Sequence, residues 1–315
     1  MRKLFVGGPG RSGTSFFADR LGQHPQVVSF ADVELKFFTE KNGLLDLWHA
    51  LGQTYSPNRA VQATEQFRRM VEALITGQYG QLPLSELLPA SDWRAVFDRF
   101  LHRLMPEQHP LPQSDASFFA AAAALLDEIV AIGLKHQADK TAPTVFLEKT
   151  PHALLSLRFL TRLAPGASYV HVMRDPRSIA NSLGRMTWGP KTPGACCAWV
   201  ASYCERWAQT LADAKAADLP VTCFHIEAIA ETPAEHARET SALLGIDPAE
   251  EMFARADLHT LNAWAERSSE EDLEQLTNRL GHWIDWFGYD RAHVGRFLAA
   301  DNQDPAGHVQ SPAAA

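Results

Sequence analysis

A glycine-rich loop near the N-terminus carries the residues best suited to bind an anion. It reads Gly7-Gly8-Pro9-Gly10-Arg11-Ser12-Gly13-Thr14-Ser15, follows the apolar run Leu4-Phe5-Val6 and leads into an amphipathic segment. Glycines let the backbone approach a tetrahedral group closely, and the start of a helix offers unpaired N–H donors and the positive end of its dipole. The loop therefore predicts a phosphate site. The alternative is a turn that merely needs glycine.

The loop departs from the Walker A pattern G-x-x-x-x-G-K-[ST] at one decisive position. Gly8, Gly13 and Ser15 match the pattern, but Thr14 stands where the lysine should be. Arg11 supplies a cation inside the loop instead. We therefore expect the loop to hold a phosphate but to lack the residue that reaches the β- and γ-phosphates of ATP.

Two further polar clusters follow apolar runs that predict strands. The first is Glu148-Lys149-Thr150-Pro151-His152, and the second is Arg174-Asp175-Pro176-Arg177-Ser178, which leads to Ser182 along an expected helix. Ligands of open α/β sheets gather at the carboxyl ends of strands, so these clusters are expected at the same edge as the loop. From the residues alone, the lysine can equally be solvated, and Asp175 can simply cap the helix while the arginines face solvent.

Together the three clusters resemble the motifs of the sulfotransferase family that uses 3′-phosphoadenosine 5′-phosphosulfate (PAPS). Arg11-Ser12-Gly13-Thr14-Ser15 matches the family's phosphosulfate loop [RK]-[SG]-G-[TS]-[TS], most closely in the form of its tyrosylprotein and bacterial members. The resemblance implies that Arg174 and Ser182 bind the 3′-phosphate and that Lys149 stabilises charge on the departing nucleotide. Arg267 lies where family members close over the nucleotide and is expected to contact a phosphate. The residues implied for the 5′-phosphosulfate are Gly10, Arg11, Ser12, Gly13, Thr14 and Ser15.

Glu34 is the expected general base. The stretch Glu34-Leu35-Lys36-Phe37-Phe38 resembles the Glu-x-x-Phe-Phe element of carbohydrate sulfotransferases and occupies the place of the glutamate in the tyrosylprotein enzymes. A hydroxyl acceptor must lose its proton as it attacks sulfur, and a carboxylate within hydrogen-bond reach can take it. A lone glutamate is more often a surface acid, so Asp32 and Glu40 are the alternatives. Lys36 is expected to help position the sulfonate.

The order of apolar runs and helical patterns predicts an α/β fold with a P-loop-type parallel sheet and helices on both faces. Between about residues 44 and 140, three- and four-residue spacing of apolar side chains dominates and predicts an inserted helical cap. We expect one sulfotransferase domain over 1–300 with this insertion, and a flexible tail over 301–315. The expected strands are 4–8, 27–30, 144–149, 167–173 and 221–226.

Composition excludes several classes of function. The net charge of −8, from 37 acidic and 29 basic residues, argues against nucleic-acid binding. Of the four cysteines, Cys196 and Cys197 are adjacent and no secretory signal is recognised, so no disulfide framework is expected. No C-x-x-C pair exists, so no metal site is expected. Asp127 and Glu128 interrupt the longest apolar segment, 118–134, and no signal-peptide pattern is present. We therefore expect a cytoplasmic protein without a transmembrane segment.

Three functional hypotheses remain open from the sequence. The first is a PAPS-dependent sulfotransferase that acts by in-line attack of a hydroxyl acceptor, which is a small molecule, a sugar or a peptide tyrosine, with Glu34 as base and no metal. The second is a P-loop kinase or nucleotide hydrolase with an atypical Walker A loop, which Thr14 weakens. The third is a non-catalytic nucleotide-binding relative, which would need neither Glu34 nor Lys149.

Overall fold

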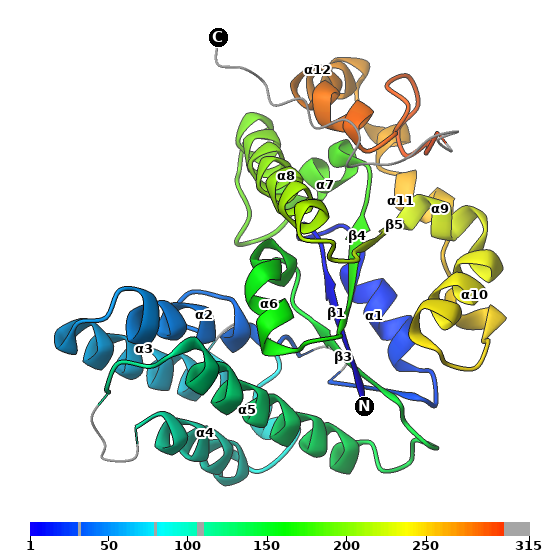
Figure 1. Cartoon of the computed structure of the whole chain (residues 1–315). Helices are drawn as coiled ribbons and strands as arrows, with labels where there is room; N and C mark the ends of the chain where they lie inside the picture. The colour runs from blue at the N-terminus through cyan, green and yellow to red at the C-terminus, as the bar shows by residue number, and fades with distance from the viewer. Residues whose placement is uncertain (31–32, 79–80, 106–109, 299–315) are drawn as a thin grey trace. The chain divides into compact units, whose positions relative to one another are not determined.

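A computed structural model describes residues 1–30, 33–78, 81–105 and 110–298 (Figure 1). Its five strands form one parallel sheet in the order β2-β3-β1-β4-β5, flanked by helices. The strands are β1 (Arg2–Gly7), β2 (Val27–Ser29), β3 (Val145–Lys149), β4 (Ser168–Met173) and β5 (Thr222–His225). The α-helices are α1 (Thr14–Gly22), α2 (Leu44–Trp48), α3 (Pro57–Ile75), α4 (Ala90–Leu104), α5 (Asp115–His136), α6 (Leu157–Leu163), α7 (Pro176–Gly184), α8 (Pro193–Ala216), α9 (Ile226–Glu231), α10 (Pro233–Leu244), α11 (Leu258–Asn262) and α12 (Glu270–Trp286).

Local sequence signals explain where the helices begin and end. Asp175 caps α7 by accepting a hydrogen bond from the Arg177 backbone N–H, and Pro176 occupies the first helical position. Gly245 ends α10 in the left-handed conformation at φ 61°, and Gly288 follows α12 at φ 73°. These starts and stops agree with the sequence signals because capping depends on neighbouring residues alone.

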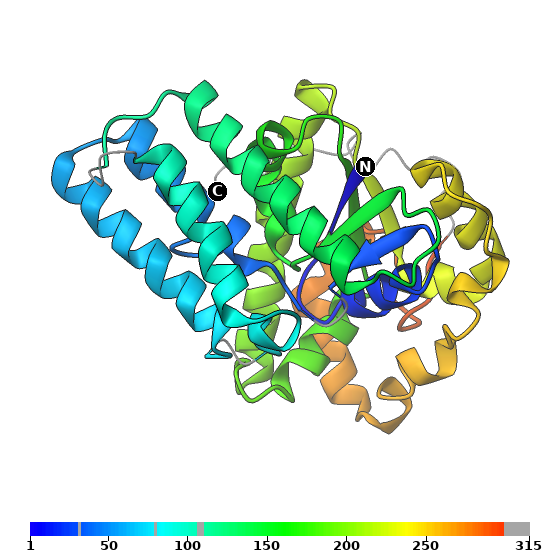
Figure 2. The same cartoon turned by 90° about the horizontal axis from the view of Figure 1, so that it is seen from below.

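The chain divides into two compact units. Unit 1 comprises Met1–Phe5 and Leu21–Ser168. In it, β2 pairs with β3 in parallel, with Val27 opposite Val145 and Ser29 opposite Leu147. Helices α4 and α5 lie side by side (Figures 1 and 2). The core of this helical part is aromatic and includes the fully buried side chains of Phe67, Trp93, Phe100 and Phe118.

Helix α5 is long and apolar enough to cross a membrane by length and composition alone. Half of its most apolar window is buried, however, and two of its charged side chains form ion pairs within unit 1. Glu128 binds Arg99 and Arg103 of α4, and Asp127 binds Lys3. These contacts are those of a core helix packed within a folded unit, which passes the same test of length and composition.

Unit 2 comprises Val6–Arg20 and Tyr169–Ala315. In it, β4 pairs with β5 in parallel, with Val170 opposite Thr222 and Met173 opposite His225. Helix α12 packs on α7 and α8. Phe17 of α1 stacks between Phe224 and Phe253, at ring-centre distances of 5.4 and 5.2 Å. This stack fixes the helix that follows the glycine-rich loop.

The predicted strands and the parallel sheet are confirmed, with one difference after the last strand. Strand β5 ends at His225, and Ile226–Glu231 forms α9, so Ile226 begins a helix and does not end the expected strand 221–226. Helices α2 to α5 occupy the region 44–140, as its periodicity predicts. The single domain over 1–300 stays a prediction, and the tail 301–315 lies outside the described residues.

Candidate active site

The glycine-rich loop of unit 2 is tightly curled between β1 and α1. A Cβ on Gly8 would come within 2.2 Å of the Val172 carbonyl oxygen, so only glycine fits beside β4. Gly13 has φ 100°, and Arg11 has φ 76°, a region that non-glycine residues rarely adopt. The Ser12 N–H donates to the Pro9 carbonyl at 3.1 Å and closes the turn. Turns of this kind gather backbone N–H groups around an anion.

The loop side chains divide into buried and exposed sets. Ser12 and Thr14 are buried, Gly10 and Gly13 are half-buried, and Arg11 and Ser15 are exposed. The Ser12 hydroxyl oxygen is fully buried and has no hydrogen-bond partner within the described residues. Since an unpaired buried hydroxyl is costly, an anion seated on the loop would gain a donor already in place.

The two elements predicted to bind phosphates meet in unit 2. Nε of Arg11, on the loop, donates to Oγ of Ser182, on α7, at 3.1 Å. Arg174 follows the last residue of β4, with 15% of its side chain exposed. Its guanidinium donates to the Leu261 carbonyl, and its Nε lies 3.9 Å from the Glu227 carboxylate. Burial lowers the pKa of Arg174, and the Glu227 charge opposes that shift.

Arg177 has a different role from Arg174, although the two lie in the same short motif. It is buried and forms an ion pair with Asp175 at 2.8 Å. It also donates to the carbonyl groups of Asp290 and Arg291 at 2.6 and 2.8 Å. Asp175 in turn accepts from the Gly295 N–H. Arg177 therefore anchors the segment after α12, and the alternative that these arginines face solvent is wrong for it.

Glu227 and Tyr289 form a support for Arg174, of which the sequence indicated only Glu227, as a structural residue. Tyr289 donates its hydroxyl to Glu227 at 2.7 Å, and the Asp175 N–H donates to the other oxygen at 3.1 Å. Burial, reinforced by the Asp175 charge, raises the pKa of Glu227 to about 7. Glu227 resembles a family element of structural character, but nothing in the sequence pointed to Tyr289.

Arg267 lies at the end of a short 3-10 turn, Ala265–Arg267, and is exposed. The preceding residue of this segment, Trp264, donates its indole N–H to Ser178 of α7 at 2.9 Å. The turn that bears Arg267 is thus attached to the same helix as Ser182. Contact between Arg267 and a nucleotide stays a prediction.

Glu34 and Lys149 form an ion pair in unit 1. Lys149 ends β3, is 5% exposed, and its Nζ lies 2.9 Å from Oε1 of Glu34. Nζ of Lys36 lies 3.5 Å from the other oxygen of Glu34. The structure thus brings the proposed base between the two lysines that the sequence singled out. Of the alternative bases, Glu40 is half-buried and Asp32 lies outside the described residues.

Glu148 fixes the segment that carries Glu34, a role that the sequence did not reveal. It is buried, and its Oε1 accepts from the Leu35 N–H at 3.2 Å and from the Thr150 hydroxyl at 2.6 Å. Its Oε2 has no partner within the described residues. Burial raises the pKa of Glu148 to about 8, so the carboxyl group is largely neutral at pH 7. Gln81 completes the support by donating to the Glu34 carbonyl at 3.0 Å.

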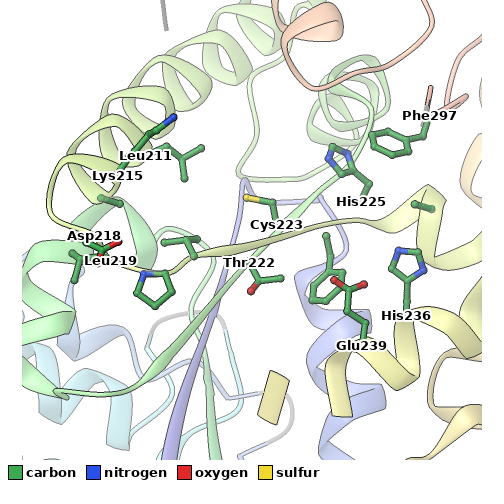
Figure 3. A pocket seen from close by; sticks show the side chains of 15 residues that line it. Leu211, Lys215, Asp218, Leu219, Thr222, Cys223, His225, His236, Glu239 and Phe297 are labelled. Atoms are coloured by element: carbon green, nitrogen blue, oxygen red, sulfur yellow. The ribbon is translucent and has the colours of Figure 1, made fainter. Parts of the chain in front are cut away.

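A separate cavity of about 910 Å³ lies beside β5 in unit 2 (Figure 3). Cys223 and His225 of β5 and His236 and Glu239 of α10 line part of it. It includes no residue of the glycine-rich loop, nor Arg174 or Ser182, so it is distinct from the candidate nucleotide site. Among the described residues, no group of three or more His, Cys, Asp or Glu could hold a metal ion, and all four cysteines are free.

Comparison with known proteins gives a family match and several distant structural matches. A family model described as "Sulfotransferase family" matches residues 3–251. The sulfotransferase domain from the Synechococcus PCC 7002 olefin synthase is 14% identical, with 89% of this chain and 94% of that chain covered and a TM-score of 0.47. The sulfotransferase domain from the curacin biosynthetic pathway is 13% identical, with coverages of 89% and 97% and a TM-score of 0.47. Sulfotransferase STF1 from Mycobacterium tuberculosis H37Rv is 16% identical, with coverages of 89% and 76% and a TM-score of 0.42. No curated protein sequence matches the chain.

Proposed function

Because the chain belongs to the sulfotransferase family and is an enzyme of that class, we propose that it moves the sulfuryl group of PAPS to a hydroxyl acceptor. The observation that carries the proposal is the hydrogen bond between Arg11 and Ser182. It joins the loop that resembles a 5′-phosphosulfate site to the helix that resembles a 3′-phosphate site. A nucleotide with anionic groups at both ends of its ribose would engage both elements.

The donor specificity follows from where positive charge is available in unit 2. Arg11 is exposed on the loop, and its Nε donates to the Ser182 hydroxyl and not to a carboxylate. Arg174 is held at the end of β4, with Glu227 at 3.9 Å. ATP has no 3′-phosphate that could bind Arg174 and Ser182. In addition, Thr14 stands in place of the lysine that would contact the terminal phosphates of ATP. The arrangement therefore favours PAPS over ATP.

In the proposed reaction, Glu34 and Lys149 of unit 1 act together, Glu34 as the base and Lys149 as the charge that stabilises the leaving group. Glu34 takes the proton of the acceptor hydroxyl, and the acceptor oxygen forms a bond to sulfur. The bond between sulfur and the bridging oxygen breaks, and its electron pair stays on the 5′-phosphate of the nucleotide. Once Glu34 is neutral, the charge of Lys149 is no longer balanced within their 2.9 Å pair and can stabilise the leaving phosphate.

A calorimetric titration with 3′-phosphoadenosine 5′-phosphate tests the donor, with AMP and ATP in parallel. We expect the bisphosphate to bind at least tenfold more tightly than AMP, because a charged hydrogen bond to the 3′-phosphate is worth about 1.5–3 kcal/mol. Arg174→Ala and Ser182→Ala should remove this preference, whereas Arg255→Ala, at an exposed arginine, is the matched control. Equal binding of ATP and the bisphosphate would refute the PAPS assignment and favour a kinase.

A further inference from the structure

Two tryptophans of unit 2 converge on the glycine-rich loop at Gly10. A Cβ built on Gly10 would lie 3.7 Å from Cη2 of Trp188 and 3.7 Å from Cη2 of Trp199. These distances are ordinary van der Waals contact, so both indole edges border the residue that precedes Arg11. The loop predicted to hold the sulfuryl group therefore has an aromatic wall, which we define as Trp188 and Trp199.

Trp199 is held in place by a column of rings that continues into the core of unit 2. Trp199, Tyr203 and Trp207 are spaced four residues apart and so share one face of α8. The rings of Trp199 and Tyr203 lie 6.4 Å apart at 16°, and His171 stacks on Trp207 at 3.9 Å and 7°. Tyr203 and His171 also share a hydrogen bond of 3.2 Å. This half of the wall is therefore a preorganised surface.

Trp188 is presented by a tight turn between α7 and α8. The Gly189 N–H donates to the Met186 carbonyl at 3.1 Å, and a Cβ on Gly189 would come within 2.1 Å of the Leu183 carbonyl oxygen. The turn consequently requires glycine after the tryptophan. Trp188 itself is 61% exposed, more than any other large apolar side chain among the described residues. Covering a solvent-exposed indole with a flat apolar ring removes apolar surface from water and is therefore favourable.

We infer that the aromatic wall binds the acceptor and selects one whose hydroxyl is carried on an aromatic ring. The inference rests on the proposed function, because it takes the loop as the site of the phosphosulfate. A ring beside Gly10 then lies next to the sulfuryl end of the donor, whereas the adenine is separated from that end by the 5′-phosphate and the ribose. A sugar acceptor needs several polar partners for its hydroxyls, and at Gly10 the two side chains present carbon edges.

The test is calorimetry with the full chain saturated with 3′-phosphoadenosine 5′-phosphate. Naphthol, cyclohexanol and methyl glucoside are titrated as probes of an aromatic, an aliphatic and a sugar acceptor. We expect naphthol to bind most tightly, and Trp188→Ala and Trp199→Ala each to weaken it about tenfold, since one aromatic contact and its buried area are worth about 1.4 kcal/mol. Trp188→Phe should retain most of the affinity. Trp286→Ala, at a partly exposed tryptophan of α12, is the control and should change nothing.

The outcomes separate this inference from the proposed function. Loss of nucleotide affinity in the Trp188 and Trp199 variants would mean that the wall contacts the adenine, which overturns the inference and leaves the PAPS site standing. No naphthol binding, equal binding of cyclohexanol, or tryptophan-dependent binding of methyl glucoside would also overturn it. Failure of the unmodified chain to bind the bisphosphate would refute the proposed function, and the inference with it. Thermal unfolding of each variant shows whether it is folded.

Discussion

The Arg11–Ser182 cluster of unit 2 and the Glu34–Lys149 cluster of unit 1 differ in how closely their positive charges are paired with carboxylates. Arg11 donates to a hydroxyl group, and Arg174 donates to a backbone carbonyl and lies 3.9 Å from Glu227, a carboxyl group whose pKa is raised to about 7. Lys149 and Lys36, by contrast, share the single carboxylate of Glu34. Arginines that are only loosely paired suit the binding of a polyanion, whereas lysines held close to a carboxylate suit a step in which that carboxylate takes a proton and their charge is released.

Each cluster is also supported by a buried glutamate, and the two glutamates differ in the hydrogen bonds that their carboxyl oxygens accept. Both oxygens of Glu227 accept hydrogen bonds, one from Asp175 and one from Tyr289. Glu148 accepts both of its hydrogen bonds at Oε1, while Oε2 has no partner within the described residues. Glu227 is therefore a fixed support for Arg174, whereas the raised pKa of Glu148 keeps a proton beside the expected base. Four predictions test this comparison, in order of decreasing effect.

Glu34→Gln should cause the largest loss of activity. The amide preserves size and can still accept from Lys149, but it cannot take a proton, so kcat should fall about 100- to 10,000-fold. Nucleotide affinity should stay within about twofold, because binding belongs to the other cluster. The measurement is sulfuryl transfer from PAPS to the best acceptor in a panel of phenols, sugars and primary alcohols. Glu40→Gln is the matched control, and an equal loss in that variant would contradict the choice of Glu34.

Lys149→Met should lower kcat about 100- to 1,000-fold, because the variant lacks the charge that stabilises the leaving phosphate. Methionine fills a similar volume at this buried position, so the fold should persist. Lys36→Met, which removes the second and more exposed lysine from Glu34, should cost about tenfold or less. Single-turnover kinetics of both variants provide the comparison. Equal losses would show that the two lysines act only as a joint partner of Glu34.

Glu148→Gln should change how stability depends on pH. Because burial raises the pKa of Glu148 from 4.5 to about 8, the folded protein binds more protons than the unfolded chain between these values. The free energy of unfolding of the original protein should therefore fall as pH rises from about 5 to 8, by at most about 1.4 kcal/mol per pH unit for this one group. The amide mimics the neutral acid, so the variant should lack this component.

Urea unfolding across the same pH range measures the difference between Glu148→Gln and the original protein. Glu148→Ala serves as a second variant, because it also lacks the titrating group but leaves the Leu35 N–H without its acceptor, so it should be less stable than Glu148→Gln by about 1–3 kcal/mol at every pH. Parallel stability curves for Glu148→Gln and the original protein would refute a neutral, proton-holding Glu148.

Tyr289→Phe should have the smallest effect. It removes the hydroxyl that donates to Glu227 at 2.7 Å and should cost about 1–3 kcal/mol of stability, because one oxygen of a buried carboxyl group is left unpaired. Affinity for 3′-phosphoadenosine 5′-phosphate should fall less than about tenfold, since Arg174 itself remains. Thermal unfolding and calorimetry report the two effects. Tyr55→Phe, at a part-buried hydroxyl of unit 1, is the control and should leave nucleotide affinity unchanged.

The sequence by itself determined the features that depend on near neighbours. The strands, the α7 cap at Asp175 and the left-handed end of α10 at Gly245 all follow from periodicity, capping and glycine conformation over a few residues. The glycine-rich loop and the three motifs could be recognised for the same reason. Each motif is a short run of residues whose types alone indicate an anion, a base or a counter-charge.

Tertiary structure alone decided which of those residues meet and which are only structural. Arg11 and Ser182 are 171 positions apart, and no local signal relates them. Arg174 and Arg177 look alike in sequence, but packing against the Asp290–His293 segment makes only Arg177 an anchor. The neutral state of Glu148 and the meeting of Trp188 and Trp199 at Gly10 likewise arise from burial. Burial and long-range contact depend on how distant segments pack, and local residue patterns carry little of that information.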